Sequence, residues 1–520
     1  MYLRISKGRQ KNYLVLVEGY REDGVVKQRT ICNLGAIDDK KTKQALSLGK
    51  NLLSKFGARG IIDGSEISEE ERSNWGAYEV LQCLWRRYSL EDFWHRHLQP
   101  RKLEYDLPNI LQAMIAGRMC RPSSKLALFE EQDFYSGFGK FKLHNMYKVL
   151  DELDKYKDEL SKHLFDMQQK INGPAYIAFF DVTTMYFESQ KLDDLRAFGF
   201  SKDCKFNEVQ IVLSLLTDYA GNPLAYELFP GNMYEGGTLE RQLVKLKEKY
   251  NLEKATIVAD RGMYCRANLE SLAAMGFEYI VGTKLRTSKS DIKQEVLSQE
   301  DYIYSQGEEF KCKRIISSER GNHKENIIAA WSKKRGDKDL RDRERLIEKA
   351  SKLLGKGNMQ DKRGGKKYLK MSKTSAELDR QKIAEDALWD GYYGVSTNSD
   401  LSPEAALDAY HKLWRIEESF RLMKSYFQTR PMFHWTPSRI SGHIMINFMA
   451  MIFEKYLENY LNKAGAKMSP ETIRAAINES QKSIINIDKK RYITHAKLSQ
   501  EADILLKNLG IGIPKSYAIN

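Results

Sequence analysis

The chain has 520 residues, of which 42% are hydrophobic and 30% charged, enough apolar content for roughly two to four globular domains. Its longest apolar run, residues 444–453, is shorter than the roughly 20 residues that cross a bilayer, and its charged N-terminus is unlike a secretory signal, so we expect neither a membrane-spanning nor a secreted protein. The formal net charge of +14 favours a polyanionic partner, of which nucleic acid is the commonest.

The cysteines indicate the redox compartment. They lie far apart and form no C-x-x-C pair, which argues against a zinc site or a disulfide framework. We therefore expect free thiols in a reducing cytoplasm. The six are Cys32, Cys83, Cys120, Cys204, Cys265 and Cys312.

The first third of the chain divides into a short strand-forming region and a longer helical region. Residues 11–36 alternate apolar and polar side chains around the turn sequence REDG, which predicts a small antiparallel hairpin. Residues 71–170 have helical periodicity, with turn residues at 99–108 and 135–139.

From Ala175 the pattern changes to strands and helices in alternation. Three consecutive strands are followed by helix, strand, helix and strand, which predicts a mixed sheet with helices packed on it. The segment GYYGVSTN, 391–398, then precedes a strong helix over 403–427. The predicted strands are 176–187, 208–218, 223–229, 255–260 and 278–284, and the predicted helices are 238–250 and 265–276.

Residues 331–374 carry most of the excess positive charge. The segment has 16 Lys and Arg against 6 Asp and Glu, so +10 of the net +14 lies here. A polyanion-binding surface would have this composition. A solvated helix followed by a Gly- and Lys-rich loop would have it as well.

Two acids occupy unusual positions in the predicted strands. Asp181 interrupts a run of strand formers at its centre, although Asp is depleted from strands and rarely buried unpaired. Asp260 ends a short apolar strand and is followed by Arg261 and Gly262. Each position fits a metal ligand held on a rigid element, and Asp181 also fits an exposed strand position or a salt bridge.

A third acid lies on the predicted helix 403–427. Tyr410, Glu417 and Lys424 are spaced by seven residues, so on a regular helix they line one face. A surface helix with salt bridges has a similar pattern, and the helix alone does not separate the two interpretations.

Together these motifs resemble the DDE transposases of bacterial insertion sequences. The similarity extends over residues 171–453 and includes the stretch 199–239 between the two aspartates. The most similar branch has a Y-x2-R-x3-E-x6-K signature and a β-rich insertion before its catalytic Glu. This chain departs from the signature at Leu413, where an Arg is expected. Arg421 lies close enough to Glu417 on the helical wheel to substitute for that missing arginine.

The resemblance implies a catalytic site of three carboxylates. Asp181, Asp260 and Glu417 are the expected catalytic residues and the ligands of two Mg²⁺ ions, with Mn²⁺ able to substitute and with Asp181 bridging the two ions. It also implies that four residues bind DNA phosphates beside the cut, namely Tyr410, Arg421, Lys424 and Arg261.

The implied fold is α/β, an RNase H-like mixed-sheet catalytic core interrupted by a β-rich basic insertion, with helical N-terminal and C-terminal regions. Helices within 104–130 are candidates for reading base edges in a major groove. The expected regions are a small β-containing N-terminal region, 1–70; a helical region with possible DNA-end recognition, 71–170; the first part of the core, 171–289; the insertion, 290–385; the second part of the core with the Glu helix, 386–465; and a C-terminal helical region, 466–520.

The function that these residues favour is transposition of an insertion sequence. The protein is expected to bind the terminal inverted repeats of its element, cleave at the ends and join the 3′-hydroxyls to target DNA. We expect it to act as a homodimer in its complex with DNA, in the bacterial cytoplasm and associated with the nucleoid. Two alternatives stay open: an RNase H-fold nuclease or resolvase, and a domesticated DNA-binding protein without catalysis.

Overall fold

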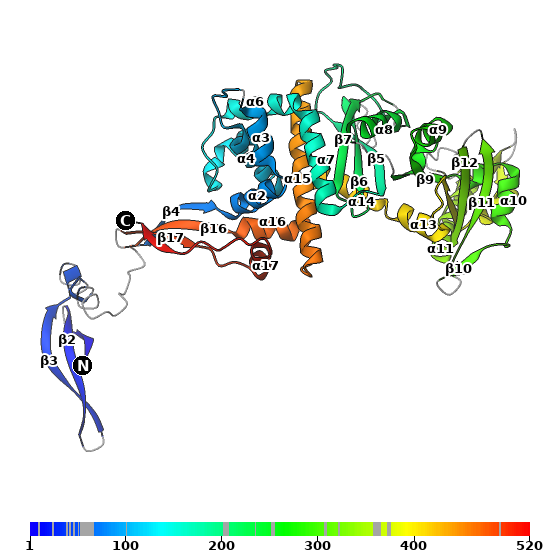
Figure 1. Ribbon diagram of the computed structural model, residues 1–520. Coiled ribbons are helices and arrows are strands. Elements are labelled where there is room, and N and C mark those ends of the chain that lie inside the picture. The colour runs from blue at the N-terminus through cyan, green and yellow to red at the C-terminus, as the bar shows by residue number, and fades with distance from the viewer. Residues whose placement is uncertain are drawn as a thin grey trace. The chain divides into compact units, whose positions relative to one another are not determined.

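The computed structural model forms two compact units (Figure 1). The first comprises Met1–Arg72, Ser483–His495 and Lys515–Asn520, and the second comprises Ser73–Lys482 and Ala496–Pro514. The structure describes residues 1–8, 11–22, 25–37, 40, 43–44, 47–49, 51, 67–99, 101–200, 207–233, 236–250, 255–305, 309–320, 323–356, 364, 366–371, 376–487 and 490–519.

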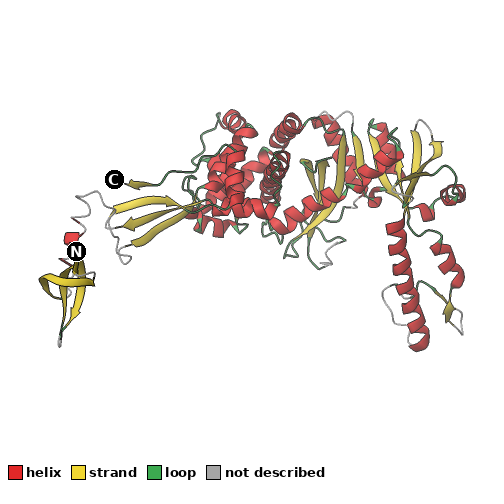
Figure 2. Ribbon diagram, turned by 90° about the horizontal axis from the view of Figure 1, so that it is seen from below, coloured by secondary structure: helices red, strands yellow, loops and turns green. Residues whose placement is uncertain are grey.

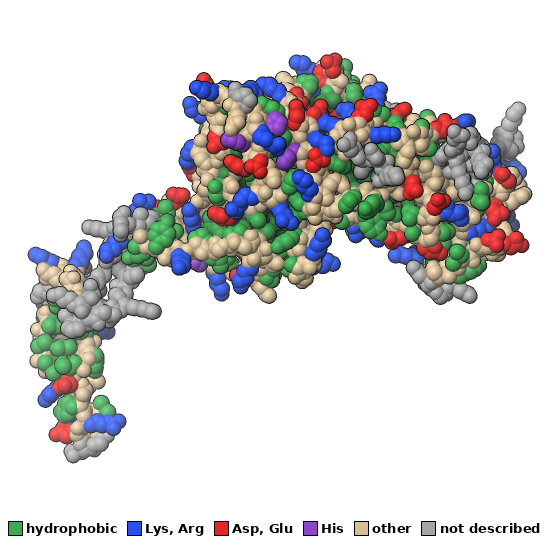
Figure 3. Space-filling view, in the orientation of Figure 1, with side chains coloured by type: hydrophobic (Ala, Val, Ile, Leu, Met, Phe, Trp, Pro, Cys, Tyr) green, Lys and Arg blue, Asp and Glu red, His purple; other side chains and the backbone are tan. Residues whose placement is uncertain are grey.

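The N-terminal strands form a three-stranded antiparallel sheet in the order β1-β2-β3. They are β1 (Tyr2–Lys7), β2 (Asn12–Glu22) and β3 (Val25–Ala36), so the hairpin predicted over residues 11–36 is confirmed. The sheet leaves large apolar side chains such as Leu3, Ile5 and Val26 in solvent. Figure 3 shows hydrophobic side chains at the surface of this part of the chain.

A four-stranded sheet joins strands from the two ends of the chain in the order β18-β17-β16-β4. These are β4 (Ile67–Asn74), β16 (Gln481–Ile487), β17 (Lys490–His495) and β18 (Tyr517–Ile519). The C-terminal region, expected to be helical, therefore also contains three strands.

A nine-stranded mixed sheet dominates the second unit, in the order β10-β11-β12-β15-β9-β8-β5-β6-β7. Every strand predicted between residues 176 and 284 is present. The core strands are β5 (Ile177–Tyr186), β6 (Gln210–Asp218), β7 (Pro223–Pro230), β8 (Thr256–Ala259) and β9 (Glu278–Thr283), and the crossover helices are α8 (Gly236–Tyr250) and α9 (Arg266–Ala274).

The five core strands have an RNase H-like arrangement. β6 lies antiparallel between β5 and β7, whereas β8 is parallel to both β5 and β9. Alternate residues of β5 enter different cores: Phe179 and Met185 pack on one side of the sheet, Ala178 and Phe180 on the other. A strand covered on both faces reads as a continuous apolar run, which is why Asp181 stands out in the sequence.

The segment between β9 and β15 (Tyr392–Thr397) extends this same sheet. β15 pairs with β9, and the insertion strands follow in turn beyond β15, all antiparallel. A long helix and a short hairpin project from them (Figure 2, lower right). The insertion contains α10 (Ser290–Leu297), β10 (Ile303–Ser305), β11 (Phe310–Arg320), β12 (His323–Ser332), α11 (Lys333–Lys356), β13 (Leu369–Met371), β14 (Ala376–Leu378) and α12 (Arg380–Ala387).

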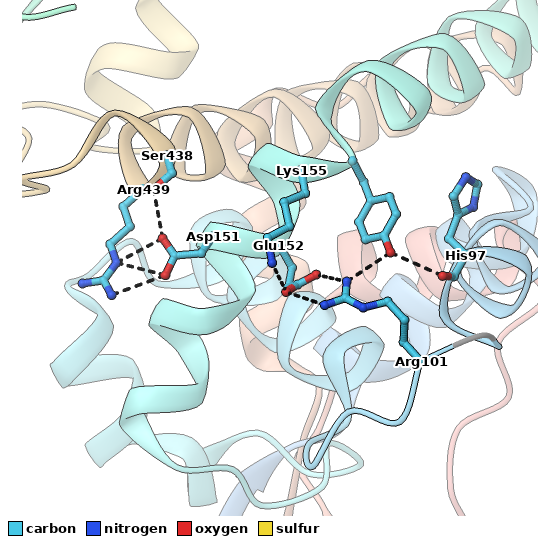
Figure 4. Close-up of polar contacts among 8 residues, drawn as sticks. His97, Arg101, Asp151, Glu152, Lys155, Ser438 and Arg439 are labelled. Atoms are coloured by element: carbon cyan, nitrogen blue, oxygen red, sulfur yellow. Dashed lines mark hydrogen bonds and ion pairs between the residues drawn. The ribbon is translucent and has the colours of Figure 1, made fainter. Parts of the chain in front are cut away.

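A helical layer surrounds α15 (Pro437–Lys463), which is buried almost throughout from Ile440 to Phe453. Its first turn is tied to α6, because Ser438 and Arg439 both bond to Asp151, at 3.0 and 3.3 Å (Figure 4). The other helices of the layer are α2 (Gly76–Arg87), α3 (Leu90–Leu98), α4 (Leu107–Cys120), α5 (Lys125–Glu130), α6 (Leu143–Lys155), α7 (Lys157–Asn172), α16 (Pro470–Glu479) and α17 (Gln500–Asn508).

The structure excludes one helix of the 104–130 region as a reader of base edges. α4 cannot enter a DNA groove, because Leu107 and every residue from Ile110 to Cys120 are buried inside the protein. The helix is apolar all round, which is typical of a core helix.

Two other findings concern only the residues that the structure describes. None of their helices is long and apolar enough to span a membrane. Their cysteines are free thiols, namely Cys32, Cys83, Cys120, Cys265 and Cys312, whereas Cys204 lies outside the described residues.

Candidate active site

Neighbouring parallel strands carry the two aspartates. The register of β5 with β8 pairs Phe180 with Ala259, and the next residue on each strand is Asp181 or Asp260. Asp181 is half-buried within β5, and its carboxylate accepts a hydrogen bond of 2.7 Å from the Val182 N–H. Asp260 is exposed at the end of β8, where a short turn begins.

The alternation of the strands puts both aspartates on the same face of the sheet. Asp181 is in phase with Phe179, and Asp260 is in phase with Val258, and both of these apolar residues belong to the same core cluster. That cluster also contains Ile416 and Phe420 of helix α14 (Trp414–Arg421). The two aspartates therefore lie on the face against which α14 packs.

Helix α14 presents the third acid. It contacts β5 and β6 through its buried side chains, while Glu417 stays exposed to solvent. Arg415 anchors the helix to the turn after β6, since its Nη1 donates a hydrogen bond of 2.5 Å to the Tyr219 carbonyl. Arg415 therefore makes a structural contact. Glu417, two residues farther along α14, is exposed to solvent.

The single helix predicted over 403–427 is wrong. The structure contains α13 (Pro403–His411), α14 and a π-helical turn, Leu422–Tyr426. Between α13 and α14 the backbone tightens to i→i−3 hydrogen bonds, and Leu413 turns into the core. Tyr410, Glu417 and Lys424 consequently belong to three elements, and a helical wheel does not relate their directions.

Tyr410 lies beside Asp260. Burial and the nearby Asp260 carboxylate, to which its hydroxyl donates a hydrogen bond, raise the pKa of Tyr410 to about 12. The hydroxyl reaches this position across Gly282 of β9, where a side chain would collide with it. The tyrosine is therefore a neutral donor that holds the Asp260 side chain.

We expect Gly282→Ala to displace Tyr410 and weaken any activity that depends on Asp260. The added methyl group occupies the space of the tyrosine hydroxyl, so the hydrogen bond to Asp260 is broken or lengthened. Catalytic rate should fall roughly tenfold or more, because misplaced catalytic groups are costly. Gly237→Ala on α8, where an added methyl group meets nothing within 4 Å, is the control. An unchanged rate in Gly282→Ala would contradict this role of Tyr410.

Arg335 is a residue of this site that sequence reasoning missed. Its guanidinium is near enough to Tyr410 to act against the raised tyrosine pKa, and it lies 5.0 Å from the centre of the Tyr393 ring. It lines an open cavity of about 740 Å³ between α13 and the start of α11, together with Lys334, Lys338 and His411. No local signal pointed to Arg335, because sheet pairing brings it here from the insertion.

The remaining candidate phosphate contacts have different surroundings. Arg421 is exposed and lies 3.8 Å from Glu418, a loose surface ion pair. Arg261 is exposed directly after Asp260. Lys424 is half-buried on the π-helical turn. Of these three cations, Arg261 is near enough to Tyr410 to act against its raised pKa.

The donor set fits magnesium in its chemistry. All three expected ligands are carboxylates, the hard oxygen donors that Mg²⁺ prefers, and Mg²⁺ keeps waters for its remaining positions. Adjacent strands and a helix on the same face hold the three residues. Within the part of the chain that the structure describes, no three His, Cys, Asp or Glu side chains are grouped closely enough to hold an ion.

Comparison with known proteins gives two family matches. A family model described as "Transposase DDE domain" matches residues 172–453, and a model for the N-terminal domain of IS1634 family transposases matches residues 3–63. No curated protein matches the chain.

Similar solved structures include a piggyBac transposase synaptic complex with hairpin DNA, with a TM-score of 0.40 and 8% identity over 79% of this chain and 82% of that chain. They also include a Mos1 transposase paired-end complex, with a TM-score of 0.15 and 15% identity over 34% of this chain and 59% of that chain.

Proposed function

Because this chain belongs to the DDE transposases of insertion sequences, we propose that it binds the terminal inverted repeats of its element, cleaves the DNA at the element ends and joins the 3′-hydroxyls to target DNA. We assign the catalytic role to Asp181, Asp260 and Glu417. The observation that supports this most is the register of β5 with β8, which aligns two aspartates on the face that α14 covers.

The three carboxylates would hold Mg²⁺, or Mn²⁺ in its place. Bound there, the metal would activate the attacking water or 3′-hydroxyl and stabilise the leaving oxygen. Tyr410 would keep the Asp260 carboxylate in place through its hydroxyl. Arg261, Arg421, Lys424 and Tyr410 would contact phosphates beside the cut, where cations offset the charge of the backbone.

We also propose the regional roles. Residues 171–289 and 386–465 would be the catalytic core, and 290–385 an insertion that serves DNA binding. The segments 1–70, 71–170 and 466–520 would flank them. Because α4 is buried, we do not assign the reading of base edges to it. The working form would be a homodimer on DNA in the bacterial cytoplasm, in the nucleoid.

Strand transfer separates this function from its alternatives. A nuclease or resolvase on the same fold would cut DNA without joining its ends to a target, and a domesticated binder would do neither. The test incubates the protein with Mg²⁺, duplexes that carry the ends of its source element, and a supercoiled plasmid target. Joined products support transposition, whereas cutting without joining would favour a nuclease.

We expect Arg421→Ala to weaken binding to element ends uniformly across sequences and to lower the slope of log K against log salt by about one unit. The reason is that Arg421 would supply the phosphate contact missing at Leu413, and its exposed side chain is available for it. If it is only an ion pair with Glu418, it contributes about 0.3 to 0.5 kcal/mol of stability and leaves the slope unchanged.

Arg415→Ala is the matched control for Arg421. Its guanidinium is engaged with the Tyr219 carbonyl, so its removal should reduce thermal stability without altering the salt dependence. Equal slopes for wild type and Arg421→Ala would mean that Arg421 does not replace the arginine that is missing at Leu413.

A further inference from the structure

Helix α11 has two faces of opposite character. At about 100° per residue, six cations lie within an arc of about 80°, and no acid falls inside it. We call this arc the outer face. Its residues are Lys334, Lys338, Arg341, Arg345, Lys349 and Lys352.

The opposite face of α11 is fixed to the protein. Asp339 accepts a hydrogen bond of 3.1 Å from the Gly391 N–H, and Arg343 pairs with Asp390. Farther along, Ala350 belongs to a small apolar cluster with Tyr368 and Leu369, against which neighbouring α11 side chains pack. These contacts hold the helix rigidly and leave the outer face to solvent.

The cations of the outer face have few partners. Among the residues that the structure describes, Lys334, Lys338, Arg341 and Lys349 form no ion pair or hydrogen bond, while Arg345 and Lys352 have exposed pairs on their own helix. Like charges three or four residues apart destabilise an isolated helix. The outer face is thus a repulsive arrangement that a polyanion would relieve.

The outer face begins beside α13, the helix that carries Tyr410. Lys334 and Lys338 line the same cavity as His411, which adjoins Tyr410 in α13. Arg335, between them in the chain, lines this cavity as well, and its guanidinium lies 5.0 Å from the centre of the Tyr393 ring. From there the face continues along α11, which projects from the insertion strands (Figure 2), for about 27 Å from Lys334 to Lys352, the length of about eight base pairs.

We propose that the outer face of α11 binds the phosphate backbone of the DNA duplex as it leaves the active site. The inference rests on the proposed function, and it names one surface of the insertion as the contact for DNA within about eight base pairs of the cut. Exposed cations bind backbone phosphates through their charge, and such contacts are independent of sequence. A protein partner would need an acidic row of the same length.

The test removes three cations that have no partner, in the full-length triple variant Lys338→Gln, Arg341→Gln and Lys349→Gln. Binding to a duplex of about 30 base pairs of arbitrary sequence is measured by fluorescence anisotropy across a salt series. We expect the slope of log K against log salt to fall by about two to three units, close to one for each phosphate that the variant no longer neutralises. Affinity at low salt should fall at least tenfold.

The charge-retaining variant Lys338→Arg, Arg341→Lys and Lys349→Arg is the control, and it should bind as wild type does. An unchanged slope in the glutamine variant, with DNA binding by wild type intact, would overturn the role of α11 and leave the proposed function standing. If the glutamine variant does not fold by thermal melting, each single glutamine substitution must lower the slope by about one unit, and failure of all three to do so overturns the inference equally.

Discussion

Asp181→Asn and Asp260→Asn will each abolish cleavage and joining of element ends. Asparagine keeps the size of the side chain but removes the negative charge needed to hold the metal, and metal stabilisation of the transition state is worth several kcal/mol, a rate loss of about a thousandfold or more. DNA binding should stay within a few-fold of wild type, because phosphate contacts supply most of the affinity. Glu417→Gln should behave in the same way.

The measurement is cleavage of end-bearing duplexes with Mg²⁺, with binding followed in parallel. Glu418→Gln is the matched control, since Glu418 adjoins Glu417 on α14 but pairs with Lys455 at 3.5 Å. Activity of the wild type with Mn²⁺ but not with Ca²⁺ would fit the same site, because Ca²⁺ is larger and adopts looser geometry. Normal cutting by Asp260→Asn would refute the assignment.

Glu454→Gln should stabilise the protein increasingly as the pH rises. Glu454 is fully buried on α15, and within the described residues neither of its carboxylate oxygens has a hydrogen-bond partner. Burial raises the pKa of Glu454 from 4.5 to about 8, against a smaller opposing effect of Arg474. The folded protein therefore keeps the carboxyl protonated at neutral pH, whereas the unfolded chain ionises it.

The sign follows from proton binding. The folded state binds the Glu454 proton more tightly than the unfolded chain does. The contribution of this proton to the free energy of unfolding is therefore fully present below about pH 4.5 and is lost as the pH rises through about 8. The difference between the pKa values of Glu454 in the unfolded and folded states corresponds to a total loss of unfolding free energy on the order of 5 kcal/mol. The neutral amide of Gln removes this loss.

The free energy of unfolding in urea, measured from pH 5 to 9, checks this prediction. The difference between Glu454→Gln and wild type should grow toward pH 9 in favour of the variant. Glu458→Gln, one turn away and paired through Lys455 at 2.8 Å, should show no such growth. Parallel pH profiles for wild type and Glu454→Gln would contradict a buried neutral carboxyl.

The strands around the candidate site were predictable because their patterns are local. Each core strand between residues 176 and 284 is a short run of apolar residues bounded by turn residues, and all of them appear in the sheet. Asp181 stood out for the same reason, since a charge in such a run is rare. The family resemblance over residues 171–453 also agrees with the matched range, 172–453.

The helix region was less predictable because tertiary contacts override periodicity there. Burial of Leu413 and the bond from Arg415 to Tyr219 break the expected helix into α13, α14 and a π-helical turn. α4 likewise lies in the region expected to read base edges, but the surrounding helices bury it. Neither outcome is visible in a window of local sequence.

The sequence by itself determined the family of the protein, the core strands and the basic character of residues 331–374, because residue type and short-range spacing are local properties. It also singled out the three acids to which we assign the chemistry. Only the tertiary structure decided that Asp181 and Asp260 share a register, that Tyr410 holds Asp260 across Gly282, and that α11 starts beside α13. These relations depend on pairing between strands far apart in the chain, chiefly β5 with β8 and β9 with β15, which residue spacing does not encode.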